Sequence, residues 1–476
     1  MKSTIRAMEL PFLPARIPLP APFSFTKSMR HLREKLFEPV DVASLACFRI
    51  AFGAIMAWEA WDYFKTGWLK AHYIDPTFHF TYYGFDWVKP WPGNGMYLHF
   101  CALGVLALCI LLGLFYRVAA VLFFLGFAYV FLLEKTLYLN HFYLIVLISL
   151  LLIFIPAHRA FSIDALRHKT LHADTVPGWT LWILRAQIGI VYFYGGIAKL
   201  NPDWLRGVPL QTVLPRQTDF PLLGPFMAEK WMPLFFSYGG LLLDLLITPL
   251  LLWPRTRPFA FGMVVLFHMM NSQLFFIGIF PWLMIAATLL FFRPDWPRRI
   301  RARWFKQPLS AGGASHPAAV RGRKVVTMAA LGVYFALQLL LPLRHFLYPG
   351  DVNWTEEGHR FSWRMKLRYK EGVSTFFVTD LKSGTTWQVE QFDYLKGWQK
   401  VGLSIHPDMI LQFSHYLAEE WRRKGYEQVE VRAKVFASLN GRKPQLLIDP
   451  TIDLAKIPRN LKPATYIIPL KEPLPN

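Results

Sequence analysis

One long apolar stretch of the sequence, WILRAQIGIVYFYGGIAKLNPDW, carries side chains that could bind and deprotonate a ligand inside a membrane. Its Arg185, Tyr192 and Lys199 are seven residues apart and therefore fall near one face of a helix. Gly195 and Gly196 precede the lysine by one turn and leave room for a ligand or a second helix. Ionisable groups in such a segment are costly and face a cavity or a partner. The alternative is a snorkelling terminal lysine with a structural arginine, and this stretch alone supports both interpretations equally.

Lys199 has the greatest chemical potential of these residues. Removal from water disfavours the charged form of a lysine, and a neutral amine is a competent general base. Asp244 lies deep in another apolar segment, and we expect it to pair with Arg185 because both fall in the inner half of their segments. The sequence has no Gly-rich phosphate loop, no HExxH or CxxC metal pair and no GxSxG nucleophile motif. We therefore expect neither metal nor nucleotide chemistry.

The composition indicates that membrane helices must position these side chains. Of the 476 residues, 54% are hydrophobic and 16% are aromatic, and the apolar residues occur in long runs. This pattern predicts a mainly α, polytopic membrane helix bundle. Nine candidate spans lie near residues 43–61, 96–114, 117–134, 139–156, 180–199, 234–252, 258–273, 275–292 and 326–343.

The basic residues predict the orientation of the bundle. The net charge of +21 comes mostly from Lys and Arg beside apolar runs, which favours membrane orientation over nucleic-acid binding. Loops rich in these residues alternate with aromatic, Pro-rich loops. We therefore expect residues 1–40 and a basic linker at about 293–325 in the cytoplasm, and a transmembrane domain over 41–344. The C-terminal residues would then lie on the outer side of the membrane.

Residues 345–476 are polar enough to fold in water, and the ninth span would place them on the outer, periplasmic side. Their apolar residues alternate in four segments, as in strands, and recur at helical spacing in a fifth. We expect a small α+β domain that rests on the outer mouth of the bundle. Its predicted strands are 361–369, 374–380, 385–391 and 427–439, and its predicted helix is 406–425.

The predicted topology brings several unusual polar residues to one depth in the membrane. A lysine, two histidines and several amides would gather beneath the outer domain, where a lipid-soluble ligand could meet a water-soluble substrate. A structural role stays open for each, as an interfacial histidine or a polar junction between two helices. The residues are Lys199, Asn140, His141, His268, Asn271 and Gln273.

Several long strings in the sequence occur in an order that is informative. They include DVASLACFRIAFG, FLLEKTLYLNHFYL, LRAQIGIVYFYGGIAKLNPDW, GGLLLDLL, FHMMNSQLFFIGIF, FSWRM and FASLNGR. Over about Asp41 to Leu470, the sequence resembles the vitamin K-dependent gamma-glutamyl carboxylase family. Animal members continue beyond the point where this sequence stops, so we expect a compact bacterial-type homologue without their mode of propeptide recognition.

The resemblance implies an enzyme that converts glutamate to gamma-carboxyglutamate with CO2 and O2, coupled to epoxidation of reduced vitamin K or menaquinol. Lys199 would deprotonate the hydroquinone, oxygen would add, and the strongly basic product would remove the glutamate gamma proton. An amine is too weak a base for that last proton but can remove a naphthol-like one. His141 would support the oxygenated intermediate or bind the quinone. The candidate quinone-binding residues are Asn140, Tyr192, Gly195, Gly196, His268, Asn271 and Gln273.

The partners implied are a glutamate-containing peptide or protein, the lipid bilayer and the quinone pool. Two other functions stay open. One is a quinol-dependent oxygenase or epoxidase that acts on a non-peptide acceptor. The other is a non-enzymatic membrane scaffold, for which replacement of Lys199 by alanine would have no effect in the cell. Transport is less favoured, because the sequence shows no inverted repeat.

Overall fold

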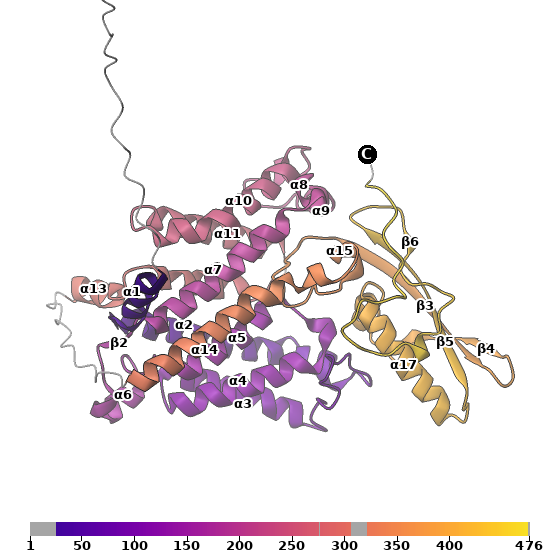
Figure 1. The fold of residues 1–476 in the computed structure, drawn as a ribbon, viewed down its shortest axis with the longest axis horizontal. Helices are drawn as coiled ribbons and strands as arrows, with labels where there is room; N and C mark the ends of the chain where they lie inside the picture. The colour runs from indigo at the N-terminus through magenta and orange to yellow at the C-terminus, as the bar shows by residue number, and fades with distance from the viewer. Residues whose placement is uncertain (1–24, 276, 306–320, 475–476) are drawn as a thin grey trace, which may run out of the picture.

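The computed structural model describes residues 25–275, 277–305 and 321–474. The predicted cytoplasmic segment 1–40 and the basic linker at about 293–325 therefore lie partly outside the described residues. Figure 1 shows the helices gathered in one part of the molecule and the C-terminal region, with its sheet and α17, at one end of them. We call the end of the bundle that faces this region the cavity end and the opposite end the far end.

All nine segments that the sequence predicts as spans are helical in the structure. Because backbone N–H and C=O groups in lipid need partners within the chain, helices are the expected form of such apolar runs. The helices are α2 (Ala43–Lys65), α3 (Gly95–Leu112), α4 (Tyr116–Leu133), α5 (Asn140–Phe154), α7 (Trp179–Lys199), α10 (Met232–Leu252), α11 (Arg257–Leu274), α12 (Phe280–Thr288) and α14 (Arg321–Leu340).

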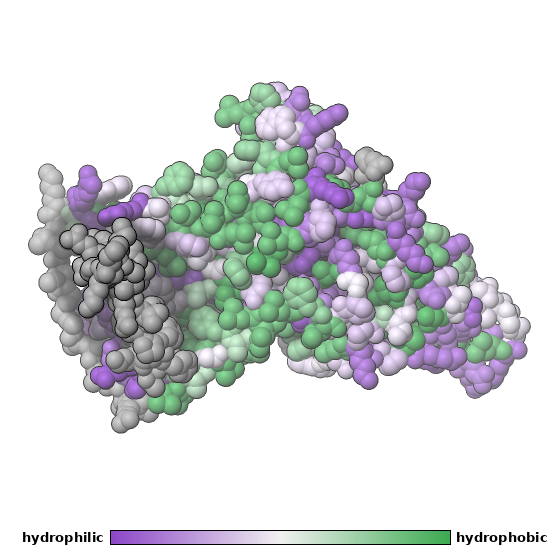
Figure 2. Space-filling model, turned by 45° about the horizontal axis from the view of Figure 1, so that its top comes forward, coloured by the Kyte–Doolittle hydropathy of each residue, from purple (hydrophilic) through white to green (hydrophobic). Residues whose placement is uncertain are grey.

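Among the described residues, six helices are long and apolar enough to cross a membrane: α2, α3, α4, α7, α10 and the segment Lys324–Leu347. Two shorter apolar helices, Asn140–Phe154 and Phe280–Phe291, accompany them. Figure 2 shows apolar side chains over the helical part and polar side chains gathered toward the C-terminal region. The chain is thus an integral membrane protein, with six of the nine predicted spans meeting both criteria.

Short elements join these helices. The strands β1 (Pro39–Asp41) and β2 (Thr175–Pro177) pair antiparallel at the far end, where α2 and α7 begin. The short helices of the helical part are α1 (Phe25–Phe37), α6 (Ile163–Arg167), α8 (Pro202–Leu205), α9 (Val208–Val213) and α13 (Trp296–Trp304).

The C-terminal region is α+β with an antiparallel sheet of strand order β4-β3-β5-β6, as expected from the sequence. Alternate residues of β5, such as Val431 and Val435, are buried against α17, whose Met409 and Phe413 repeat at helical spacing. The elements are α15 (Val352–Thr355), β3 (Lys370–Asp380), β4 (Thr386–Gln388), α16 (Gly397–Leu403), α17 (Pro407–Arg423), β5 (Val429–Leu439) and β6 (Gln445–Leu446).

The predicted strand at 361–369 is wrong. Phe361, Trp363 and Lys366 have φ values of 64°, 55° and 53°, which are incompatible with an extended strand. The alternation has another cause, since the segment lies between two environments. Trp363 is buried in the apolar core of the helix bundle, whereas Arg364 borders a cavity.

The helix bundle and the C-terminal region each contribute residues to the apolar core of the other. Trp363 from the C-terminal region belongs to the core of the bundle, and Phe361 and Met365 pack against that core. In return, Phe80, from the connection between α2 and α3, is buried in the core beneath the sheet. This mutual packing fixes the segment 361–369 against the cavity end of the bundle.

Candidate active site

A cavity of about 560 Å³ lies between the cavity end of the bundle and the C-terminal region. Its apolar half is formed by helices of the bundle, and its cationic half by residues 359–370 and 405–406 with the connection between α4 and α5. The apolar half includes Val191, Trp204, Phe236, Phe267, Phe280 and Met284, and the cationic half includes Lys135, Arg360, Arg364, Lys366, Arg368 and Lys370.

Lys199 and Asp244 form a buried pair that lines this cavity. The Lys199 Nζ lies 2.5 Å from the Asp244 Oδ2, and the two side chains are 8% and 5% exposed. The same Nζ donates to the Gly195 carbonyl oxygen at 3.2 Å and lies 5.3 Å from the centre of the Trp204 ring. The lysine is therefore neither snorkelling nor isolated, because α10 supplies a carboxylate directly beside it.

The predicted pairing of Asp244 with Arg185 is wrong. Arg185 lies 14 residues before Lys199 on α7, which is about 21 Å along the helix axis. Its Nε and Nη2 donate to the carbonyl oxygens of Leu290 and Phe292, at 2.8 and 3.0 Å. Arg185 thus satisfies backbone acceptors at the C-terminal end of the α12 segment, as a helix terminus requires.

Two imidazoles face the apolar half of the cavity. The Nε2 of His268 lies 2.9 Å from the Tyr192 hydroxyl, and its Nδ1 is buried without a hydrogen-bond partner in the described chain. The buried His141 stacks on Phe280 with ring centres 5.7 Å apart, and no group in the described chain hydrogen-bonds to its ring. Buried polar atoms without partners are rare, so the His268 Nδ1 points to a ligand with a polar atom at this position.

An apolar ring system with two oxygens fits this half of the cavity. The aromatic and methionine side chains supply apolar walls, and His268 Nδ1 and the His141 ring supply polar contacts where such a ligand needs them.

The other candidate residues differ in whether they line the cavity. Asn140 and Asn271 line the cavity. The Asn140 Nδ2 also donates to the Arg364 carbonyl oxygen at 3.1 Å and so holds the segment 361–369 in place. Gln273 is exposed and is not among the cavity residues. Gly196 packs on α10, where a Cβ would come within 2.6 Å of the Leu245 side chain.

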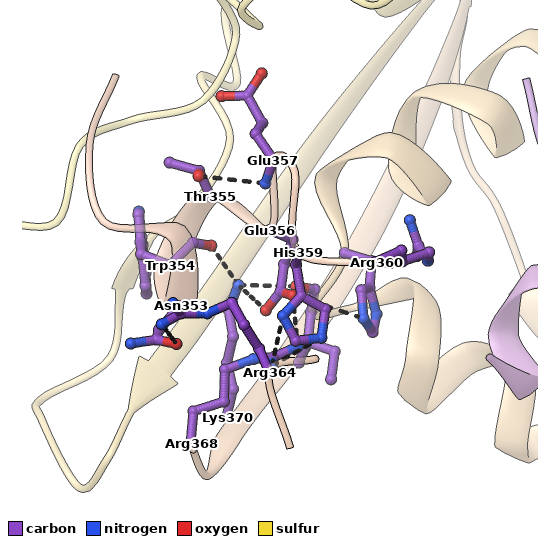
Figure 3. Close-up of polar contacts among 12 residues, drawn as sticks. Asn353, Trp354, Thr355, Glu356, Glu357, His359, Arg360, Arg364, Arg368 and Lys370 are labelled. Carbon is purple, nitrogen blue, oxygen red and sulfur yellow. Dashed lines mark hydrogen bonds and ion pairs between the residues drawn. The ribbon is translucent and has the colours of Figure 1, made fainter. Parts of the chain in front are cut away.

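A buried carboxylate organises the cationic half of the cavity (Figure 3). Glu356 pairs with Arg368 at 2.5 Å and with Lys370 at 3.6 Å, and the latter Nζ also donates to the Trp354 and Ile405 carbonyl oxygens. Burial lowers the pKa of Lys370 to about 8, and the Glu356 carboxylate opposes this shift. These contacts hold the segment that leads into β3 against the cavity.

A second carboxylate joins the C-terminal region to the bundle. Asp408 at the start of α17 lies 2.6 Å from the Lys135 Nζ and 2.9 Å from the Arg360 Nη1. These cations hold the pKa of Asp408 well below its usual range, although burial alone would raise it. Burial lowers the pKa of Lys135 to about 8. The carboxylate is therefore already neutralised by two cations that border the cavity.

Arg364, like Lys366, forms no salt bridge with a carboxylate in the described chain. It is 8% exposed, and its one side-chain hydrogen bond within the described chain runs from Nη2 to the Asn353 Oδ1 at 3.0 Å. Burial lowers its pKa to about 10. A guanidinium has five N–H donors that match a carboxylate, so Arg364 can bind an anionic substrate group. Sequence analysis did not single it out, although it lies within the FSWRM string.

Together these features define an integral membrane protein in which an α+β region closes a cavity that contains a buried lysine–carboxylate pair. Comparison with known families agrees with this architecture. Residues 37–296 match the HTTM domain, and residues 323–473 match the vitamin K-dependent gamma-carboxylase, lumenal domain. The chain belongs to the vitamin K-dependent gamma-carboxylase family, which confirms the resemblance seen in the sequence. No solved structure matches the chain.

Proposed function

We propose that this protein is a vitamin K-dependent gamma-glutamyl carboxylase that couples formation of gamma-carboxyglutamate to quinone epoxidation. The observation that carries the proposal is that the Lys199–Asp244 pair lines a cavity whose other walls are apolar helices and a cationic segment. Such a cavity lets a lipid-soluble hydroquinone and an anionic glutamate meet beside one base. Family membership supports the same chemistry.

Different residues of the chain would bind the hydroquinone, accept its proton and bind the glutamate. His268 Nδ1 and the His141 ring would hold the oxygens of the hydroquinone between the apolar walls, and Lys199 Nζ would take a proton from its hydroxyl. When bound, reduced vitamin K or menaquinol with O2 supplies the strong base that the glutamate gamma proton requires, and CO2 supplies the new carboxyl group. Arg364 would bind the glutamate carboxylate, and the apolar walls would exclude water from the carbanion.

The proposed orientation places the cationic half of the cavity toward the periplasm. The N-terminus and α13, which carries Arg298, Arg299, Arg301 and Arg303, would lie on the cytoplasmic side of a bacterial inner membrane. A peptide would then enter from the aqueous side beneath the C-terminal region, and the quinone would enter from the bilayer.

The test uses purified protein in nanodiscs with menaquinol or reduced vitamin K, a glutamate-rich peptide, O2 and labelled bicarbonate. Wild type should yield label in the peptide together with quinone epoxide. The variant Lys199→Ala should yield neither, whereas Lys65→Ala, an exposed lysine at the end of α2, should behave as wild type.

Two other outcomes would overturn the proposal. Epoxide without labelled peptide would identify a quinol-dependent oxygenase that acts on a non-peptide acceptor. Bound quinone with neither product would favour a non-enzymatic membrane scaffold.

A further inference from the structure

We infer that Asp244 shares the proton of Lys199, so that the two side chains act together as the base. This inference rests on the proposed function, because it assigns a role to Asp244 in the same proton transfer. It gives Asp244 a role at the reacting atoms in place of the pairing with Arg185 that the sequence suggested.

The backbone around the pair is built to bring the carboxylate close. A Cβ on Gly195 would lie 3.1 Å from the Asp244 Oδ2 and 3.3 Å from the Met365 Cε. Contacts of this length are tighter than side chains normally make, so a larger residue at this position would push Asp244 away from Lys199. Gly195 therefore serves the pair rather than only the packing of α7 against α10.

The surroundings of Asp244 are poor for a permanent carboxylate. Within the described chain, Lys199 Nζ is its one hydrogen-bond donor, although an ionised carboxylate accepts several hydrogen bonds. A buried ion pair with few other partners is costly, whereas a neutral amine beside a carboxylic acid avoids that cost. At 2.5 Å, the proton can pass from Nζ to Oδ2 without any movement of the backbone.

The proton count of this arrangement balances. At rest the pair holds one shared proton, carried by Asp244 when the Lys199 amine is neutral. Lys199 Nζ then accepts one proton from a ligand hydroxyl: the O–H bond breaks, an N–H bond forms, and the electron pair stays on the ligand oxygen. The pair becomes an ammonium beside a carboxylic acid, with one positive charge opposite the new anion. No oxidant is needed for this step.

The Lys199 amine can therefore be neutral without release of a proton to water. An isolated ammonium on α7 would have to lose its proton through the apolar half of the cavity before it could act. A carboxylate on α10 removes that requirement, because it stores the proton inside the site.

Infrared difference spectroscopy of the full-length protein in nanodiscs tests the inference without added quinol. Wild type minus Asp244→Asn should show the C=O stretch of a protonated carboxyl group, and this band should shift when aspartate is isotopically labelled. Lys199→Arg should lack the band, because a guanidinium does not give up its proton and keeps Asp244 ionised. Absence of the band in wild type would overturn the inference, and so would its persistence in Lys199→Arg.

Turnover then separates this inference from the proposed function. With label incorporation as the readout, Asp244→Glu should recover at least part of the activity that Asp244→Asn loses, because glutamate can still store a proton. Full activity of Asp244→Asn would overturn the inference while leaving the carboxylase intact. A protonated-carboxyl band in a protein that makes neither product would overturn the proposed function while leaving the shared proton intact. Thermal unfolding of each variant verifies that it is folded.

Discussion

The two ends of the helix bundle use buried basic side chains in opposite ways. At the far end, Arg49 donates to the carbonyl oxygens of Ile110, Leu111, Ala157 and Phe161, at 2.5 to 3.2 Å. At the cavity end, Lys199 faces one carboxylate, and the His268 Nδ1 has no partner in the described chain. Arg49 is saturated with hydrogen bonds, and the two cavity-end side chains are not.

This difference separates stability from chemistry within one bundle. Helices that end in an apolar environment leave carbonyl groups exposed, and a guanidinium with five donors can satisfy several of them at once. A side chain whose hydrogen bonds all go to backbone carbonyl oxygens of the protein has no donor left for a substrate. Buried polar groups with unused hydrogen-bonding capacity are costly, and Lys199 and His268 keep such capacity where they line the cavity, as a binding site requires.

The largest effect should come from Lys199. Replacement by alanine should lower label incorporation by about 10²- to 10⁴-fold, the contribution typical of a general base, because no other described lysine pairs with Asp244. Thermal unfolding should change much less than activity. If activity survives while the protein binds quinone normally, the chemistry does not reside in the cavity-end pair.

The second effect reverses this pattern at the far end. Arg49→Met removes four hydrogen bonds to backbone carbonyl oxygens and should destabilise the protein by about 3 to 5 kcal/mol. Activity per folded molecule should stay at the wild-type level. Thermal unfolding in detergent measures the change, and Arg185→Met, which removes two such bonds, should lie between this variant and wild type. An equal loss in both variants would contradict the saturation argument.

Periodicity and apolar length were sufficient to predict the nine apolar helices, α17 and three strands of the sheet, but not the shorter helices or β6. The failure at 361–369 shows the limit of such patterns. Alternation reports that successive side chains meet different environments, and in this segment the environments are the bundle core and a cavity rather than the two faces of a sheet.

The convergence of candidate residues on one cavity was predictable where depth in the membrane decided the outcome. Asn140, His141, Lys199, His268 and Asn271 all border the cavity, as their positions at helix ends suggested. The partner of Asp244 was not predictable. It depends on the relative position of α10 and α7 along their axes, which the sequence alone does not reveal. Arg364 was missed for a related reason, since its unpaired state appears only when its neighbours are known.

A smaller effect should distinguish two neighbouring polar residues on α11. His268→Ala should raise the KM for the quinol by about tenfold, the loss expected for one or two hydrogen bonds of about 1 kcal/mol. Gln273→Ala should leave it unchanged, because Gln273 is exposed and outside the cavity. Kinetics at saturating peptide measure both constants. A similar increase in the two variants would place the quinol outside this cavity.

The smallest effect should come from pH and should be confined to the cationic half. Burial lowers the pKa values of Lys135 and Lys370 to about 8, so both lose their charge as the pH rises through this value rather than near 10.5. The pKa of His406 is lowered to about 4, so it is already neutral and contributes no change. Attraction for a glutamate carboxylate should therefore weaken above pH 8.

The KM for the peptide should rise about two- to fivefold between pH 7 and 9, as expected for screened charges worth up to about 1 kcal/mol. The KM for the quinol should stay constant, because its half of the cavity contains neither lysine. Lys135→Arg keeps its charge over this range and should reduce the rise. An unchanged peptide KM in wild type would mean that the carboxylate binds to Arg364 without help from the lysines around it.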